Sequence, residues 1–186
     1  MKRKIVARLQ LNNGKEVVFK YPQIEDALEM MNYFNGLSKE QTFITFQGEQ
    51  ISLEFEQKRL KELLQKIKNK MAIQILVFCN SQVIAISDLI MRERAEKHIG
   101  SFGITVAKEF RGLGIGRKLM QTVIDEAISR IPQLKILVLG VFSDNPIAQN
   151  MYKKMGFIEY GSLPQGVMHK GHLDNHIYMY KKVRDL

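Results

Sequence analysis

The chain opens with two short stretches in which apolar and polar residues alternate. They run from about Lys4 to Leu11 and from Glu16 to Lys20. Alternation with a period of two is typical of a strand that buries one face. The pair Asn13-Gly14 between them favours a tight turn, because both residue types adopt positive φ angles readily. The pattern therefore predicts a β-hairpin.

Two stretches with helical spacing follow. After Pro22, apolar residues recur three and four positions apart, and Gly36 is expected to end this helix. A second amphipathic stretch covers roughly Ser52–Lys70, with leucines and an isoleucine on one face. Nothing before about Met71 carries a recognisable chemical motif.

From there to the end, apolar runs alternate with amphipathic segments. One helix is expected to start after Gly114 and to close at Pro132, and another to run from Asn145 to about Met155 before Gly156. Strands are expected at Ala72–Cys79, Gln82–Met91, Ile99–Val106, Lys135–Val141, Phe157–Met168 and His172–Val183. No repeat or linker interrupts this order. The pattern predicts a single domain over residues 1–186, with helices around one mixed sheet in an α/β or α+β architecture.

Composition and charge narrow the class of protein. The 186 residues are 45% hydrophobic and 25% charged, which fits a globular domain with a sizeable core. No apolar run approaches the length that spans a membrane, and residues 1–4 lead into no signal-type core, so we expect a cytoplasmic protein. A net charge of +9 favours phosphate-bearing ligands. The basic residues are spread along the chain, however, which favours a solvated basic surface over a nucleic-acid interface.

Neither the cysteine nor the histidines predict a redox or metal centre. Cys79 is the single cysteine and lies in an apolar strand, so we expect a buried thiol that cannot form an internal disulfide. His172, Asp174 and His176 would share one strand face, with His169 close by, but the usual spacing of cysteine or helical histidine ligands is missing. We therefore expect a half-exposed strand edge there.

The stretch from Ile104 to Lys118 is the most informative part of the sequence. An apolar strand ends, three glycines follow at alternating positions, and an amphipathic helix begins. Glycine lets the backbone approach an anion closely, and the first turn of a helix has amide N–H groups without helical partners. Arg111, Arg117 and Lys118 add positive charge. The pattern predicts a phosphate-binding turn, although a glycine turn that only permits tight packing would share it.

Two common phosphate motifs do not fit this turn. A dinucleotide fingerprint requires G-x-G-x-x-G, and Arg117 stands where its last glycine would be. A P-loop requires Gly-Lys followed by serine or threonine, and the chain has no such triplet.

Two motifs in this half resemble those of the GNAT superfamily of N-acetyltransferases. The turn Arg111-Gly112-Leu113-Gly114-Ile115-Gly116 is similar to the acetyl-coenzyme A motif Arg-x-x-Gly-x-Gly. The family pattern N-x-x-A-x-x-x-Y-x-x-x-G-F is matched at Asn145, Ala148, Tyr152, Gly156 and Phe157. Gly171–Met179 also resembles the final strand of the family. The resemblance covers about Ile99–Lys182 and implies a mixed, mostly antiparallel, twisted sheet flanked by helices, with a cofactor-binding core at about 72–183.

The resemblance also implies a site for acetyl-coenzyme A as cosubstrate, without a metal. A backbone N–H near Ile104 would stabilise the thioester carbonyl, and Thr105 and Val106 would pair with the pantetheine arm like an added strand. Asn145 would hydrogen-bond the arm, Ala148 would leave room for it, and Tyr152 would give a proton to the leaving thiolate. The turn would hold the pyrophosphate through Arg111, Gly112, Leu113, Gly114, Ile115, Gly116 and Arg117. From the helix pattern alone, Tyr152 fits a core position equally well.

The group that removes a proton from the amine is not singled out by any spacing. Relatives that acetylate protein lysines carry a glutamate at the position aligned with Gly100, and glycine is no base. Glu93, Glu96 and His98 lie just upstream, and each of them, or a water, is a candidate. Deprotonating a lysine at pH 7 costs about 4.6 kcal/mol, whereas an α-amino group costs about 1.4 kcal/mol. The missing glutamate therefore favours α-amines or other weakly basic amines.

These observations predict an enzyme that acetylates a primary amine, such as a protein N-terminus, a polyamine or another small amine, by direct transfer in a ternary complex. Two other functions stay open. One is a coenzyme A-binding regulatory module without catalysis, and the other is a basic nucleic-acid-binding protein, which leaves the match at 145–157 unexplained. The sequence is compatible with a homodimer. It identifies neither the acceptor nor the role of the first 70 residues.

Overall fold

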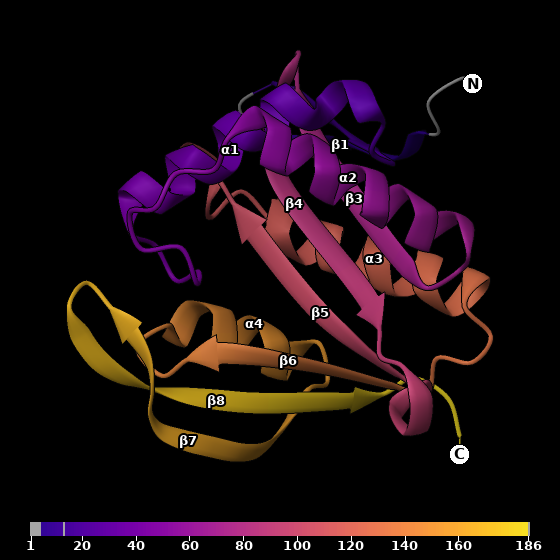
Figure 1. The fold of residues 1–186 in the computed structure, drawn as a ribbon, viewed down its shortest axis with the longest axis vertical. Helices are drawn as coiled ribbons and strands as arrows, with labels where there is room; N and C mark the ends of the chain where they lie inside the picture. The colour runs from indigo at the N-terminus through magenta and orange to yellow at the C-terminus, as the bar shows by residue number, and fades with distance from the viewer. Residues whose placement is uncertain (1–4, 13, 186) are drawn as a thin grey trace. The chain divides into compact units, whose positions relative to one another are not determined.

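A computed structural model describes residues 5–12 and 14–185 (Figure 1). Contacts divide the chain into two compact units. The first comprises Met1–Phe34, Ile51–Ile90 and Phe102–Pro132, and the second comprises Asn35–Gln50, Met91–Ser101 and Gln133–Leu186.

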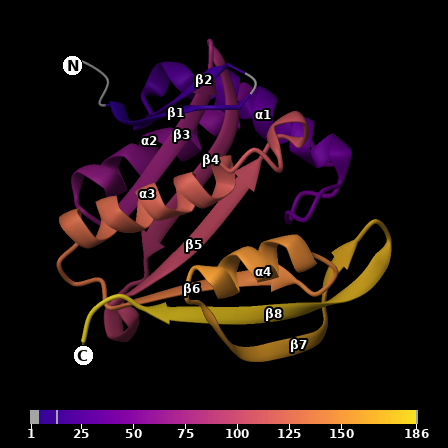
Figure 2. The same cartoon turned by 180° about the vertical axis from the view of Figure 1, so that it is seen from behind.

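The first unit is built on an antiparallel meander. β1 (Ile5–Gln10) pairs with β2 (Glu16–Lys20), β2 with β3 (Ala72–Cys79), and β3 with β4 (Gln82–Met91). α2 (Leu53–Lys68) lies on one face of β3 and α3 (Ile115–Arg130) on the other, as the opposite views of Figures 1 and 2 show. Because both faces are covered, all 8 residues of β3 are buried, Cys79 among them.

The sequence around α2 explains its position. The Ser52 hydroxyl accepts a hydrogen bond from the Phe55 N–H at 3.1 Å and so caps the helix. Lys66 and Lys68 in the last turn complement the negative end of the helix dipole. Leu60 and Leu63 of the predicted apolar face are buried, whereas Leu53, which was expected on the same face, is exposed.

The second unit is built around β6 (Ile136–Phe142). β6 pairs antiparallel with β8 (His172–Lys182), and β8 pairs antiparallel with β7 (Ile158–His169). The start of β5 (Ile99–Val106) pairs in parallel with the start of β6. α4 (Pro146–Lys154) follows β6. Residues 5–12 and 14–185 also contain three short 3-10 helices: η1 (Ile24–Asp26), η2 (Arg94–Glu96) and η3 (Lys108–Phe110).

The hydrogen-bonded strand order is β1-β2-β3-β4-β5-β6-β8-β7. The predicted mixed, mostly antiparallel sheet flanked by helices is therefore confirmed. The predicted strands and the last two helices agree with the structure to within a residue or two. The N-terminal hairpin is confirmed by the pairing of β1 with β2, while Lys4 and Asn13 lie outside the described residues.

The predicted first helix needs two corrections. It does not begin directly after Pro22: η1 comes first, with the Asp26 carboxylate accepting from the Gln23 N–H at 2.8 Å, and α1 (Ala27–Glu40) follows. Gly36 does not end it, because the helix continues to Glu40. A glycine inside a helix costs only about 1 kcal/mol, and the burial of Leu37 and Ser38 beyond it offsets that cost.

Candidate functional site

The glycine turn of the first unit joins β5 to α3. Gly112 and Gly114 have φ angles of 76° and 78°, and Gly114 occupies the N-cap of α3. A Cβ atom at either position would meet nothing within 4 Å. Gly112 and Gly114 are therefore needed for the backbone conformation and not for tight packing.

The direction of the peptide groups in β5 follows from three contacts with β4. The Ala107 N–H donates to Ile84 O at 2.8 Å, the Thr105 hydroxyl lies 3.4 Å from Ile86 O, and a Cβ at Gly103 would lie 3.0 Å from Asp88. These contacts step by two residues in opposite directions, so β4 and β5 are antiparallel neighbours.

The same alternation sorts the predicted strand residues into two groups. Positions 103, 105 and 107 turn their peptide groups toward β4, so Ile104 and Val106 turn theirs to the other edge of β5. The Val106 carbonyl there accepts a hydrogen bond from Arg111 Nε at 2.9 Å. The Thr105 hydroxyl accepts from the Tyr33 hydroxyl at 2.9 Å, which ties α1 to β5.

In the second unit, Asn145 and Tyr152 belong to α4. Asn145 is the N-cap, and its Oδ1 accepts from the Ala148 N–H at 3.1 Å. A ligand contact from Asn145 would therefore come from its amide nitrogen. Tyr152 is 7% exposed, and its ring lies 6.1 Å from that of Phe157. Burial raises the pKa of Tyr152 to about 12, so its phenol is protonated at neutral pH. No described residue of its unit hydrogen-bonds the phenol oxygen.

The three candidate bases also lie in the second unit. Glu96 forms an exposed ion pair with Arg92 at 2.7 Å. Glu93 is the exposed N-cap of η2, and the His98 carbonyl accepts from Lys135 and Ile136. Nothing in these contacts singles out one of them as a base.

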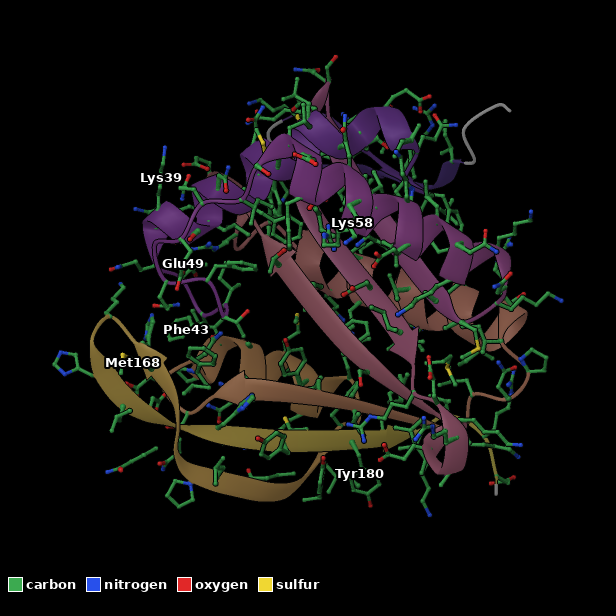
Figure 3. All side chains as sticks on the ribbon, in the orientation of Figure 1. Lys39, Phe43, Glu49, Lys58, Met168 and Tyr180 are labelled. Atoms are coloured by element: carbon green, nitrogen blue, oxygen red, sulfur yellow. The ribbon has the colours of Figure 1, made fainter. Side chains whose placement is uncertain are left out.

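The histidine-rich strands make other contacts. His169 lies 3.0 Å from Gln41 O and stacks on Phe43 with ring centroids 4.3 Å apart, while His172 is exposed. Figure 3 shows Phe43 next to these strands. The Asp174 carboxylate accepts from Ser143 Oγ, from the Asp144 N–H at 3.0 Å and from the Asn175 N–H at 2.7 Å. Burial raises the pKa of Asp174, but these bonds lower it by more, and the net shift is downward. The described residues bring no three metal-ligating side chains together.

Sequence reasoning missed one polar group in the first unit. Gln74 and Asp88 are directly opposite each other on β3 and β4, and Gly103 on β5 adjoins Asp88. Arg59 of α2 faces Asp88 and is held by Glu56 through two bonds of 2.8 and 2.6 Å. Burial raises the pKa of Asp88 to about 6, against the opposing charge of Arg59. A signal was present, since both residues interrupt otherwise apolar strands.

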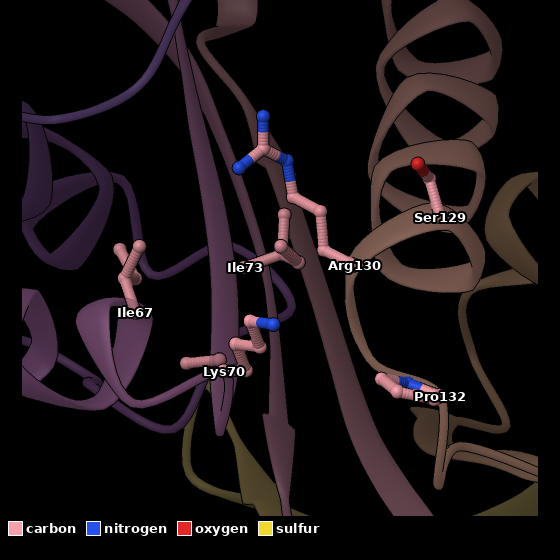
Figure 4. Close-up of a pocket in the computed structure, with 7 residues that line it drawn as sticks. Ile67, Lys70, Ile73, Ser129, Arg130 and Pro132 are labelled. Atoms are coloured by element: carbon pink, nitrogen blue, oxygen red, sulfur yellow. The ribbon is translucent and has the colours of Figure 1, made fainter.

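A cavity of about 320 Å³ also lies in the first unit (Figure 4). Its lining includes Lys70, Ile73 and the end of α3 at Ser129 and Arg130. At 1.5 Å per residue, these positions are about 21 Å along α3 from the glycine turn. The cavity is therefore separate from the predicted phosphate site. Among the described helices, none has the length and apolarity that crossing a membrane requires.

Comparison with known proteins agrees with the motifs. Residues 38–157 match the sequence model of the Acetyltransferase (GNAT) family. A stretch of 69 residues, 37% of this chain, is 30% identical to the L-amino acid N-acyltransferase MnaT of Escherichia coli (strain K12). That stretch spans only 39% of the length of MnaT.

Solved structures share the fold over most of the chain. An acetyltransferase of the GNAT family from Streptococcus pneumoniae is 25% identical with a TM-score of 0.82, covering 90% of this chain and 99% of that one. The spermidine N-acetyltransferase of Vibrio cholerae, solved with CoA and spermine, is 22% identical with a TM-score of 0.72, covering 89% of this chain and 95% of that one.

Proposed function

The chain belongs to the GNAT acetyltransferase family, and from that premise we propose that it is an N-acetyltransferase. It moves the acetyl group of acetyl-coenzyme A (acetyl-CoA) to a primary amine by direct transfer in a ternary complex. Acetyl-CoA supplies the acetyl group as a thioester, and the protein binds and orients both substrates. No metal takes part in this proposal.

The observation that carries the proposal is the open glycine turn before α3. Gly112 and Gly114 have positive φ angles, and a Cβ at either position would face open space at the start of α3. Such a turn favours a pyrophosphate, because amide donors and the helix dipole both attract anions. Leu113, Ile115 and Gly116 would contribute backbone donors, while Arg111 and Arg117 would contribute charge.

The edge of β5 supports a role in holding the pantetheine arm. Ile104 and Val106 direct their peptide groups away from β4, so they are the residues able to pair with an extended ligand there. In this proposal Ile104 N–H stabilises the charge that develops on the thioester oxygen. The peptide groups of Thr105 turn toward β4. In this proposal Thr105 therefore holds β5 against β4 and does not pair with the ligand.

α4 supplies the remaining contacts. The amide nitrogen of Asn145 donates a hydrogen bond to the pantetheine arm. The small side chain of Ala148 leaves space beside the arm. Tyr152 gives its proton to the leaving sulfur. Its raised pKa supports this assignment, since the phenol keeps its proton until the sulfur becomes anionic.

The acceptor is the finer part of the proposal. α-Amines and polyamines are the first classes to examine, because the relatives with a similar sequence or fold include an L-amino acid N-acyltransferase and a spermidine N-acetyltransferase. α-Amines have the additional advantage that they lose a proton more readily than lysine side chains.

A screen of amines tests the function. The protein is mixed with acetyl-CoA and, in turn, with free amino acids, polyamines and peptides with free N-termini, and release of the CoA thiol is followed together with the mass of the amine. Turnover with one class is expected. Tight CoA binding without turnover on any amine would instead favour a regulatory module.

We also propose that residues 1–186 form a single N-acetyltransferase domain. The proposal includes a cytoplasmic location and a homodimeric state. Size-exclusion chromatography with light scattering tests the last of these.

A further inference from the structure

The polar group formed by Gln74, Asp88 and Gly103 stands out because it lies on adjacent strands that are largely buried. Gln74 is 1% exposed, and its Oε1 has no hydrogen-bond partner among the described residues. A buried acceptor left without a donor costs about 1–3 kcal/mol. An unpaired buried oxygen requires an explanation, and a bound group that supplies the missing donor is one.

The Asp88 carboxylate lies beside that oxygen. The two residues are directly opposite in the antiparallel register of β3 and β4, so their side chains share one face of the sheet. Asp88 is half-buried, so part of the residue remains accessible. An ammonium group has three donors and one positive charge, and it matches a carboxylate next to an amide oxygen.

Gly103 lets the Asp88 carboxylate lie close to the backbone of β5. A Cβ atom there would lie 3.0 Å from Asp88 Oδ1. The φ angle of Gly103 is not positive, so the backbone does not require glycine at this position. The next residue is Ile104, which the proposed function places at the thioester carbonyl. A group bound beside Asp88 is therefore next to the residue of β5 that precedes Ile104, on the β4 side of that strand.

Charges around Asp88 are compatible with a bound cation. The facing charged group is Arg59 of α2, and its guanidinium is paired with the fully buried carboxylate of Glu56. Phe34 of α1 lies against the same guanidinium, 5.0 Å from ring centroid to Cζ. Glu56 therefore offsets part of the Arg59 charge, and the remaining attraction of Arg59 favours the ionised form of Asp88.

We propose that Gln74 and Asp88 bind the ammonium group of the acceptor beside Gly103, and that Asp88 is the base that removes its first proton. This inference rests on the proposed function and names the base that the sequence left open. Asp88 takes one proton from the ammonium, and the free amine forms the new C–N bond as the C–S bond breaks. The acylated nitrogen then loses a second proton. This proton returns to the Tyr152 oxygen and replaces the proton that Tyr152 gives to sulfur. The proton on Asp88 then passes to water.

The acidity of Asp88 fits this task. With a pKa of about 6 the carboxyl is mostly ionised at pH 7, and it is a stronger base than an exposed aspartate. Proton transfer from an α-ammonium with a pKa near 8 is then roughly 10²-fold unfavourable, compared with roughly 10⁴-fold for an ordinary aspartate. The same transfer from lysine remains roughly 10⁴-fold unfavourable, so the site favours α-amines.

The test compares Asp88→Asn with Asp125→Asn, an exposed aspartate on α3 that serves as the matched control. Asp88→Asn is expected to lower kcat by roughly 10²–10⁴-fold with unchanged CoA affinity. The wild-type rate should rise with pH through about 6, and this limb should vanish in Asp88→Asn. If Asp88→Asn lowers kcat by less than about threefold and its rate still rises with pH through about 6, the proposal is overturned. If the wild-type protein acetylates no amine, the proposed acetyltransferase function is overturned instead.

Two further variants keep the test decisive if Asp88→Asn folds poorly. Gly103→Ala places a methyl group against Asp88 Oδ1 and so displaces the carboxylate, which should raise KM for the amine by about tenfold without weakening CoA binding. Gln74→Leu removes the amide oxygen, and it should also raise this KM. If Gln74 is only a core residue, Gln74→Leu will stabilise the protein and leave KM unchanged, which contradicts the proposal.

Discussion

The imidazole ring of His176 occupies the space that a side chain at Gly140 would fill. A Cβ atom at Gly140 would lie 2.1 Å from Nε2 of the ring. The two residues belong to paired strands, β6 and β8, and the ring also stacks on Tyr178 with centroids 4.6 Å apart. Glycine at 140 is therefore required by the histidine of the neighbouring strand.

Replacing Gly140 by alanine is expected to destabilise the fold. The methyl group must displace the His176 ring from its stack, and such overpacking costs about 1–3 kcal/mol. Gly161→Ala on β7 is the control, because a Cβ there meets nothing within 4 Å. Urea denaturation measures both. Equal stability of the two variants would show that the ring moves aside at no cost.

His176 should also make stability depend on pH. Burial lowers the pKa of His176, so the folded chain holds a neutral ring where the unfolded chain, with a histidine pKa near 6.5, binds a proton. This contribution to the free energy of unfolding is present above pH 6.5 and is lost as the pH falls below it. His176→Gln should flatten the profile between about pH 7 and 5. His172→Gln, at an exposed position, should leave it unchanged.

The glycine turn offers a matched pair of substitutions. Gly114 and Gly14 have φ angles of 78° and 79°, and both face open space. Alanine is therefore strained equally at both sites, by about 1–2 kcal/mol. Only Gly114→Ala is expected to weaken CoA binding, by about tenfold, because it places a methyl group over the amides of α3. Calorimetry with CoA decides this, and equal affinity of the two variants would remove the turn from the binding site.

Tyr152→Phe tests the proton donor. The ring stays in place and only the hydroxyl is lost, so fold and CoA affinity should change little. A general acid contributes roughly 10²–10⁴-fold, and single-turnover acetylation should slow by about that factor. Tyr160→Phe, 55% exposed on β7, is the control. If Tyr152→Phe slows single-turnover acetylation by less than about threefold, water and not Tyr152 is the proton donor to the sulfur.

The sequence by itself determined the elements and the glycine turn. Periods of two and of 3.6 residues are local, and so is the need for glycine where φ is positive, as at Gly112 and Gly114. The helices α3 and α4 were predicted for this reason. The first helix was predicted less well, since burial beyond Gly36 outweighed its low helix propensity.

Only the tertiary structure decided which residues that are distant in the sequence lie close together in space. Gly140 and His176, or Gln74, Asp88 and Gly103, meet through the register of neighbouring strands. A shift of one residue in register would turn every side chain of a strand to the opposite face. Register is set by the packing of whole strands against helices, as for β3 between α2 and α3, and no local pattern encodes it. The turn is thus a property of the sequence, and the polar group around Asp88 is a property of the fold.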